Sequence, residues 1–322
     1  MKNQTRSVSE IILLGFSVAK RFEPLLFTSF FITYTIALAG NFLIITVVWC
    51  EHSLHSPMYM FIANLSLLEA LYTTSVIPKM LADFFRQKKS ITFNSCIFQA
   101  YLYFSAGSTE FFLLGVMSFD RYVAICNPLR YTAIMNTRFC MHLIAASWLL
   151  GFLAVMPPAI LILQLPFCGP NIINHFFCDV GPLLKLSCFD TKNIERMNFA
   201  NAAFFLLGSL LVTGVSYMSI IVTVIKIPSA KGRQKAFSTC ASHLMVVTLF
   251  YGSSIFIYVQ PQENHSLDLN KVASILNTVV TPLLNPFIYS LRNKKVKEAL
   301  ESVVRRIIGT LTGMRVLNIK KI

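Results

Sequence analysis

Seven long apolar runs constrain this chain more than any other feature. They lie at about 25–49, 58–81, 95–120, 139–163, 197–226, 237–260 and 271–291. Each is long enough to cross a hydrocarbon core, which requires roughly 20 residues of helix. Only 13% of the residues are charged, whereas a soluble domain carries about 25%. The sequence therefore predicts an all-α membrane protein, with one seven-helix transmembrane bundle over residues 25–291.

The two ends of the chain predict its orientation. Residues 1–24 are too polar for a secretory signal, so we expect the run that begins at Leu25 to act as an uncleaved signal-anchor. With this N-terminus extracellular, the loops carry seven Lys and Arg inside against eight outside and decide nothing. Nine more in the tail, 292–322, favour a cytoplasmic C-terminus. We therefore interpret the net charge of +14 as orientation at an anionic lipid bilayer, with no nucleic-acid partner.

Short patterns in the terminal and loop segments agree with that topology. Asn3 begins a glycosylation sequon on the predicted outer side, and Asn264 begins another between the sixth and seventh runs. Four apolar residues of the tail have Lys and Arg between them and are spaced by 4, 3 and 4: Val296, Leu300, Val303 and Ile307. That spacing predicts a short amphipathic helix on the inner leaflet, with a frayed basic tail as the alternative.

Four of the eight cysteines lie where the topology predicts an oxidising environment, in which disulfides persist. They are Cys96, at the start of the third run, and Cys168, Cys178 and Cys188, in the long connection that follows the fourth run. Four cysteines allow three pairings, and we expect Cys96 to be bridged to the connection, which would hold it across the mouth of the bundle. A zinc cluster is the alternative, although no C-x-x-C spacing is present.

Two carboxylates fall within the apolar runs, Glu69 in the second and Glu110 in the third. Because a charge at bilayer depth is costly, such a residue predicts a functional role. The spacing of Tyr103, Glu110 and Arg121 places all three on one face of a helix. Polar stripes recur in the fifth, sixth and seventh runs. For single Ser, Thr and Asn residues, hydrogen bonding between helices is the simpler interpretation.

Longer motifs carry a resemblance to a known family. Gly40-Asn41, FDRY at 119–122, Trp148 and NPFIY at 285–289 resemble rhodopsin-like G-protein-coupled receptors. A narrower set resembles the olfactory receptors and runs in order from roughly residue 10 to 300. It consists of LHSPMYMF at 54–61, MSFDRYVAICNPLRY at 117–131, HFFCD, SY at 216–217, KAFSTCASH at 235–243 and PLLNPFIYSLRN at 282–293.

The resemblance implies a switch at the cytoplasmic end of the bundle. In such receptors Asp120 would hold Arg121 at rest, and activation would free Arg121 toward Tyr217 and the G protein as the sixth helix swings outward. The switch set is Asp120, Arg121, Tyr122, Tyr217, His243, Asn285 and Tyr289. The partner implied is a heterotrimeric stimulatory G protein that raises cyclic AMP at the plasma membrane. The resemblance also implies the pairings Cys96–Cys178 and Cys168–Cys188.

The resemblance further implies a sodium site formed by Glu69, Glu110 and Asn285, and no other cofactor. Many relatives carry Asp where this chain has Glu69, and the extra methylene changes the ion geometry. Two carboxylates that face each other share either a cation or a proton.

The positions that match the family's ligand pocket are mainly aromatic and aliphatic, with a few hydroxyls and one amide. They are Tyr103, Phe104, Gly107, Ser108, Asn201, Ala202, Phe205, Tyr251, Ser254, Ile255, Tyr258, Ile275 and Thr278. Such a lining suits a small neutral volatile odorant, held by apolar burial and one or two hydrogen bonds. It disfavours amines and carboxylic acids, which would need a charged partner.

The sequence disfavours two other classes of function and leaves a third open. The chain has no H-E-x-x-H or G-x-S-x-G motif, so we do not expect an enzyme. It has no internal repeat with paired broken helices, which disfavours a transporter. A receptor of the same class that senses a non-odorant small metabolite outside the nose remains an open alternative.

Overall fold

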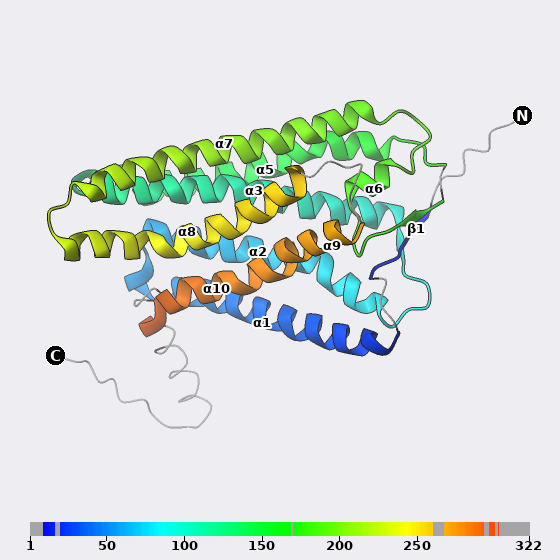
Figure 1. The fold of residues 1–322 in the computed structure, drawn as a ribbon, viewed down its shortest axis with the longest axis horizontal. Helices are drawn as coiled ribbons and strands as arrows, with labels where there is room; N and C mark the ends of the chain where they lie inside the picture. Colours follow the sequence, from blue (N-terminus) through cyan, green and yellow to red (C-terminus); the bar gives the residue numbers. More distant parts are fainter. Residues whose placement is uncertain are drawn as a thin grey trace, which may run out of the picture.

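The computed structural model describes residues 9–16, 20–168, 170–259, 267–292, 296–299 and 302. Long helices run side by side along its length (Figure 1). They are α1 (Glu23–Cys50), α2 (Pro57–Asp83), α3 (Phe93–Cys126), α5 (Thr137–Leu163), α7 (Lys192–Ile225), α8 (Ala230–Val259) and the final segment α9 (Leu267–Ile275), η4 (Leu276–Val280) and α10 (Thr281–Arg292). Short helices lie between them: η1 (Lys20–Phe22), η2 (His52–Leu54), η3 (Pro128–Arg130), α4 (Tyr131–Ile134) and α6 (Val180–Leu184).

The seven-helix prediction is confirmed. Six of these helices are long and apolar enough to cross a membrane, and α8 contains a shorter apolar stretch, Cys240–Ile255. The third helix ends at Cys126 rather than at residue 120, which corrects the predicted boundary. The helix ends only where Asn127 leaves helical geometry before Pro128. Asn3, Asn264 and most of the predicted amphipathic helix lie outside the described residues.

The central helix of the bundle is α3. In its most apolar stretch 67% of the residues are buried, against 22% in α5 and 28% in α1. It lies between α2, α5, α7 and α8, so its two ends are in reach of most of the other spans. A side chain on α3 can therefore connect several helices at once, which matters for the sites described below.

In two spans, a carbonyl group that a proline leaves without its helical donor accepts a hydrogen bond from an amide side chain of a neighbouring helix. Proline has no N–H group, so the carbonyl four residues earlier loses its helical donor. Pro286 leaves the carbonyl of Pro282 free, and Asn41 Nδ2 donates to that oxygen at 3.1 Å. Pro158 likewise frees the carbonyl of Ala154, which accepts from Asn201 Nδ2 at 3.1 Å. Such replacement donors are what allow proline in a membrane helix.

The contact between α3 and α5 depends on Gly151, where the two backbones meet. A Cβ atom there would lie 2.7 Å from Thr109 N and 2.9 Å from Thr109 Cα, and neither backbone atom can move away alone. We expect Gly151→Ala to lower the free energy of unfolding by about 1–3 kcal/mol, as overpacking does. Thermal unfolding of the purified protein checks this. Gly214→Ala in α7 is the matched control, because nothing lies within 4 Å of its added Cβ, and an unchanged Gly151→Ala midpoint would contradict the account.

A small sheet at one end of the bundle was not predicted. Strand β1 (Glu10–Leu13) lies between β2 (Ser90–Thr92), with which it is antiparallel, and β3 (Ile172–Ile173), with which it is parallel. Ile11 and Leu13 are each only 1% exposed. The segment after β1 turns at Gly15, whose φ of 68° favours glycine. The N-terminal segment thus packs onto the end of the bundle that carries both disulfides, called here the disulfide end.

Candidate functional site

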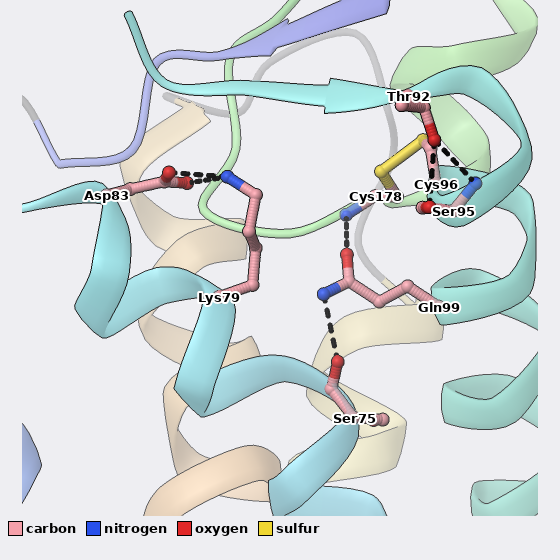
Figure 2. Close-up of a disulfide and its surroundings, with 8 residues drawn as sticks. All are labelled: Ser75, Lys79, Asp83, Thr92, Ser95, Cys96, Gln99 and Cys178. Carbon is pink, nitrogen blue, oxygen red and sulfur yellow. Dashed lines mark hydrogen bonds and ion pairs between the residues drawn. A yellow bond between two sulfur atoms is a disulfide. The ribbon is translucent and has the colours of Figure 1, made fainter. Parts of the chain in front are cut away.

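The long connection between α5 and α7 is fixed to α3 at the disulfide end. Cys96 is bonded to Cys178, with their Cα atoms 5.3 Å apart. Figure 2 shows that Gln99 of α3 lies beside this bridge and points toward α2. Its Oε1 accepts from Cys178 N at 3.0 Å, and its Nε2 donates to Ser75 O at 2.9 Å. A single amide thus joins the loop to two helices, a role that the sequence analysis missed.

The second bridge, Cys168–Cys188, closes the connection on itself. All four outer cysteines are therefore in disulfides, so the alternative of a zinc cluster is wrong. The four free cysteines are Cys50, Cys126, Cys140 and Cys240. Among the described residues, no group of three or more His, Cys, Asp and Glu side chains could hold a metal ion.

The loop residues after β3 form a buried aromatic cover at this end. The ring of His175 lies 4.4 Å from that of Phe177, and the ring of Phe177 lies 4.5 Å from that of Tyr103 in α3. Burial, together with the nearby charge of Lys271, lowers the pKa of His175 to about 3. The imidazole is therefore neutral at physiological pH. Lys271 Nζ itself donates at 2.8 Å to the carbonyl of Gly15 and at 2.8 Å to Asn174 Oδ1.

Beneath this cover, several predicted pocket residues gather around Tyr103. Its ring stacks on Tyr72 of α2 at 4.4 Å and meets the ring of Phe104 edge-on at 5.2 Å. Thr278 Oγ1 donates to the Tyr103 hydroxyl at 3.5 Å. The other predicted residues that are buried or half-buried on the surrounding helices are Gly107, Ser108, Ala202, Phe205, Tyr251, Ser254 and Ile275.

For the other three predicted pocket residues, the structure does not show a buried placement around Tyr103 with a free side chain. The amide N–H of Asn201 is already used, because Nδ2 caps the Ala154 carbonyl that Pro158 leaves free. Ile255 is 38% exposed, unlike its neighbour Ser254, so it lies toward the outside of α8. The side chain of Tyr258 lies outside the described residues. Sequence spacing alone could not reveal the first case, since the acceptor is 47 residues away.

The two membrane carboxylates lie about midway along α2 and α3, close enough for Glu69 to act electrostatically on Glu110. Asn285 Nδ2 donates to Glu69 Oε1. Among the described residues, Glu110 Oε1 and Asn285 Oδ1 are buried without a hydrogen-bond partner. Asn285 thus contacts Glu69, and both carboxylates are buried.

At the opposite end, called here the Arg121 end, Asp120 and Arg121 form a buried ion pair. Arg121 Nε donates to Asp120 Oδ2 at 2.9 Å, and the guanidinium Nη2 donates to the same oxygen. Asp120 is 1% exposed and Arg121 is 6% exposed. The hydroxyl of Tyr131 donates to Asp120 Oδ1 at 2.7 Å, and burial together with this carboxylate raises the pKa of Tyr131. Tyr131 closes the motif that begins at residue 117, but the sequence analysis gave it no role.

The remaining predicted switch residues lie on the surrounding helices, except Asn285, whose amide is bonded to Glu69. Tyr217 of α7 and His243 of α8 are joined by a hydrogen bond of 2.6 Å between the hydroxyl and Nδ1. Tyr289 is 2% exposed and its hydroxyl has no partner among the described residues. Tyr122 is half-buried beside Tyr217. In this arrangement Arg121 is held by Asp120 while Tyr217 is bonded to α8.

Comparisons with known proteins identify what this arrangement is similar to. A family model described as olfactory receptor matches residues 30–307. The chain is 52% identical to mouse olfactory receptor 6E1, over 95% of this chain and 98% of that protein. It is 49% identical to human olfactory receptor 6X1, over 94% and 97%. Among solved structures, squid rhodopsin superposes with a TM-score of 0.71 at 20% identity, covering 90% of this chain and 87% of that one.

Proposed function

This chain belongs to the olfactory receptor family, and from that premise we propose that it senses small, neutral volatile odorants and activates a stimulatory G protein. The family assignment makes it a multi-pass plasma-membrane receptor with the rhodopsin-type fold and not an enzyme. We place the N-terminus outside the cell and the C-terminus in the cytoplasm. The disulfide end then faces the ligand, and the Arg121 end faces the G protein.

The chemistry around Tyr103 carries the proposal for the ligand class. Tyr72, Phe104 and Phe177 surround it with aromatic surface, and the hydroxyls of Tyr103 and Thr278 supply the polar groups. His175, in the cover, is neutral because burial lowers its pKa to about 3. The charge of Lys271 is held by the carbonyl of Gly15 and the amide of Asn174. A small neutral molecule with one oxygen matches this lining, because apolar burial supplies affinity and one hydroxyl supplies orientation.

The closed Asp120–Arg121 pair supports coupling to a G protein. A buried ion pair next to the end of a bundle is a two-state element that a ligand elsewhere can bias. Tyr217, toward which Arg121 would be freed, packs in one cluster with Tyr122, the residue that follows Arg121. Release of the pair would expose a guanidinium to the cytoplasmic partner.

The experiment is a cyclic AMP assay in cells that express the chain with a stimulatory G protein. The panel contains neutral alcohols, aldehydes, ketones and esters, with matched amines and carboxylic acids. We expect a dose-dependent rise for a subset of the neutral compounds only. A response confined to amines or acids would overturn the ligand class. Silence to every volatile, with a response to a non-volatile metabolite and surface expression verified, would replace odorant sensing with metabolite sensing.

We also propose that Glu69, Glu110 and Asn285 hold a sodium ion. The residues fit such an ion, because Glu110 Oε1 and Asn285 Oδ1 are among the buried oxygens that have no hydrogen-bond partner in the described part of the chain, and hard cations bind oxygen ligands. A bound cation would offset the cost of two buried carboxylates. The alternative that the pair shares one proton predicts no dependence on sodium.

Replacing sodium by choline is therefore expected to lower the thermal midpoint of the purified receptor by a few degrees, because a ligand that binds only the folded state stabilises it. Glu110→Gln should abolish that difference, since the variant lacks one of the two charges that attract the ion. A midpoint that does not respond to sodium in the unmutated receptor, but shifts with pH, would establish the shared proton instead.

A further inference from the structure

A set of buried hydroxyls connects the middle of the bundle to the Arg121 end. Tyr251 of α8 bonds to Ser209 of α7, and Ser209 Oγ donates to the carbonyl of Phe111 in α3 at 2.7 Å. Thr213 Oγ1, one turn along α7, lies 3.4 Å from the Tyr251 hydroxyl. Ser118 of α3 donates to Thr213 Oγ1 at 3.0 Å. All four hydroxyl side chains belong to residues that are buried.

The number of hydroxyl protons determines which group donates in each of these hydrogen bonds. Each hydroxyl can donate only one proton. With Ser118 donating to Thr213, Thr213 donates to Tyr251, Tyr251 to Ser209, and Ser209 to the carbonyl. Four protons then make four hydrogen bonds, and the last acceptor is a backbone oxygen that needs no further partner. Chains of this kind polarise one another in a low dielectric, so the bonds are formed or lost together.

Ser118 also has a second acceptor available. Its Oγ lies 2.9 Å from the carbonyl of Leu114, one turn earlier in α3. If Tyr251 moves away with α8, Ser118 can donate to the Leu114 carbonyl and Thr213 can then donate to Ser118, so both hydroxyls keep an acceptor. The chain can therefore open without a large penalty, as an element with two arrangements must.

This chain of hydrogen bonds ends next to the switch residues Arg121 and Tyr217. Ser118 lies three residues before Arg121 on α3, and Thr213 lies four residues before Tyr217 on α7, so each is one helical turn from a switch residue. We propose that Ser118 and Thr213 are positioning residues which hold α3, α7 and α8 in the resting arrangement through Tyr251 and release them when a ligand displaces it. This inference rests on the proposed function and adds a path from the ligand region to Arg121.

The test measures ligand-free cyclic AMP at matched surface expression for Ser118→Ala, Thr213→Val and the double variant. Ser118→Ala removes one neutral hydrogen bond of the set and should raise basal signalling roughly two- to tenfold. Thr213→Val removes that bond and the bond to Tyr251, so it should raise basal signalling at least as much. The double variant should not exceed Thr213→Val by more than about twofold, because that change already removes the bond to Ser118. Thr213→Ser, which keeps the hydroxyl, should behave as the wild type. If the increase in basal signalling of the double variant equals the product of the two single increases, the hydrogen-bond chain is wrong.

Matched controls and a second readout separate this proposal from the function on which it rests. Thr248→Val removes an exposed hydroxyl of α8 that donates to the Leu244 carbonyl of its own helix, and Ser219→Ala removes one of α7 that donates to the Val215 carbonyl. If Ser118→Ala and Thr213→Val raise basal signalling no more than these controls, the positioning role is wrong. If the wild type couples to no G protein, the proposed function has failed. In that case the thermal midpoints of the purified variants test the hydrogen-bond chain. If the midpoint losses of Ser118→Ala and Thr213→Val add up in the double variant, the hydrogen-bond chain is wrong.

Discussion

Arg121→Ala is expected to abolish agonist-driven activation of the G protein while leaving the receptor at the cell surface. Arg121 is 6% exposed, and its ordered partner is the neighbouring carboxylate of Asp120. The change removes the cation that the released switch would present to its partner. It also leaves Asp120 with the hydroxyl of Tyr131 as a donor, which limits the cost to folding. Cyclic AMP measured against surface level should stay at the basal value at every agonist concentration.

Asp120→Asn is the matched variant, and it is expected to raise basal signalling instead of abolishing activation. It keeps the size of the side chain and its capacity to accept from Tyr131, but it removes the charge that holds Arg121. Hydrogen bonds to charged groups contribute about 1.5–3 kcal/mol, so the resting arrangement should lose roughly a factor of ten in population and basal signalling should rise. Full agonist responses from Arg121→Ala, or basal signalling in Asp120→Asn that matches the wild type, would remove the switch assignment.

Cys96→Ser and Cys178→Ser are each expected to block delivery to the cell surface. The bridge closes a separation of 82 residues, and loss of a native disulfide costs about 2–5 kcal/mol. Without it, Gln99 would hold the loop through a single hydrogen bond to Cys178 N. Surface labelling of intact cells gives the measurement, and we expect at least a tenfold loss relative to the wild type.

Cys50→Ser serves as the control for that prediction, because Cys50 is a free and exposed cysteine. It should reach the surface at wild-type levels. Gln99→Ala tests the amide separately, and we expect an intermediate loss because it removes two hydrogen bonds but leaves the covalent link. Normal trafficking and signalling by either Cys96→Ser or Cys178→Ser would show that the bridge is not needed for the folded receptor.

The sequence predicted the features that are local and periodic. Runs of apolar residues gave seven spans, and the spacing of Tyr103, Glu110 and Arg121 placed them correctly along one helix. Boundaries were less accurate, because the charges of Asp120 and Arg121 ended the apolar run although the helix itself continues to Cys126. A helix supported by protein contacts does not stop where the hydropathy falls.

The features that were missed depend on pairs of residues far apart in the chain. Strand β1 is four residues long and finds its partners near residues 91 and 172, so no local pattern marks it. The donor role of Asn201 follows from Pro158 on another helix. Gln99 and Tyr131 are likewise defined by partners that only folding brings near. These are the residues whose roles the structure adds to the sequence analysis.

Ligand-driven activation of a G protein is tested most directly with purified components. The receptor in lipid nanodiscs is mixed with a purified stimulatory heterotrimer, and nucleotide exchange on the α subunit is timed with and without the activating volatile. We expect a dose-dependent acceleration that Arg121→Ala removes. Exchange that stays at the intrinsic rate, with a folded receptor that still binds the volatile, would contradict it.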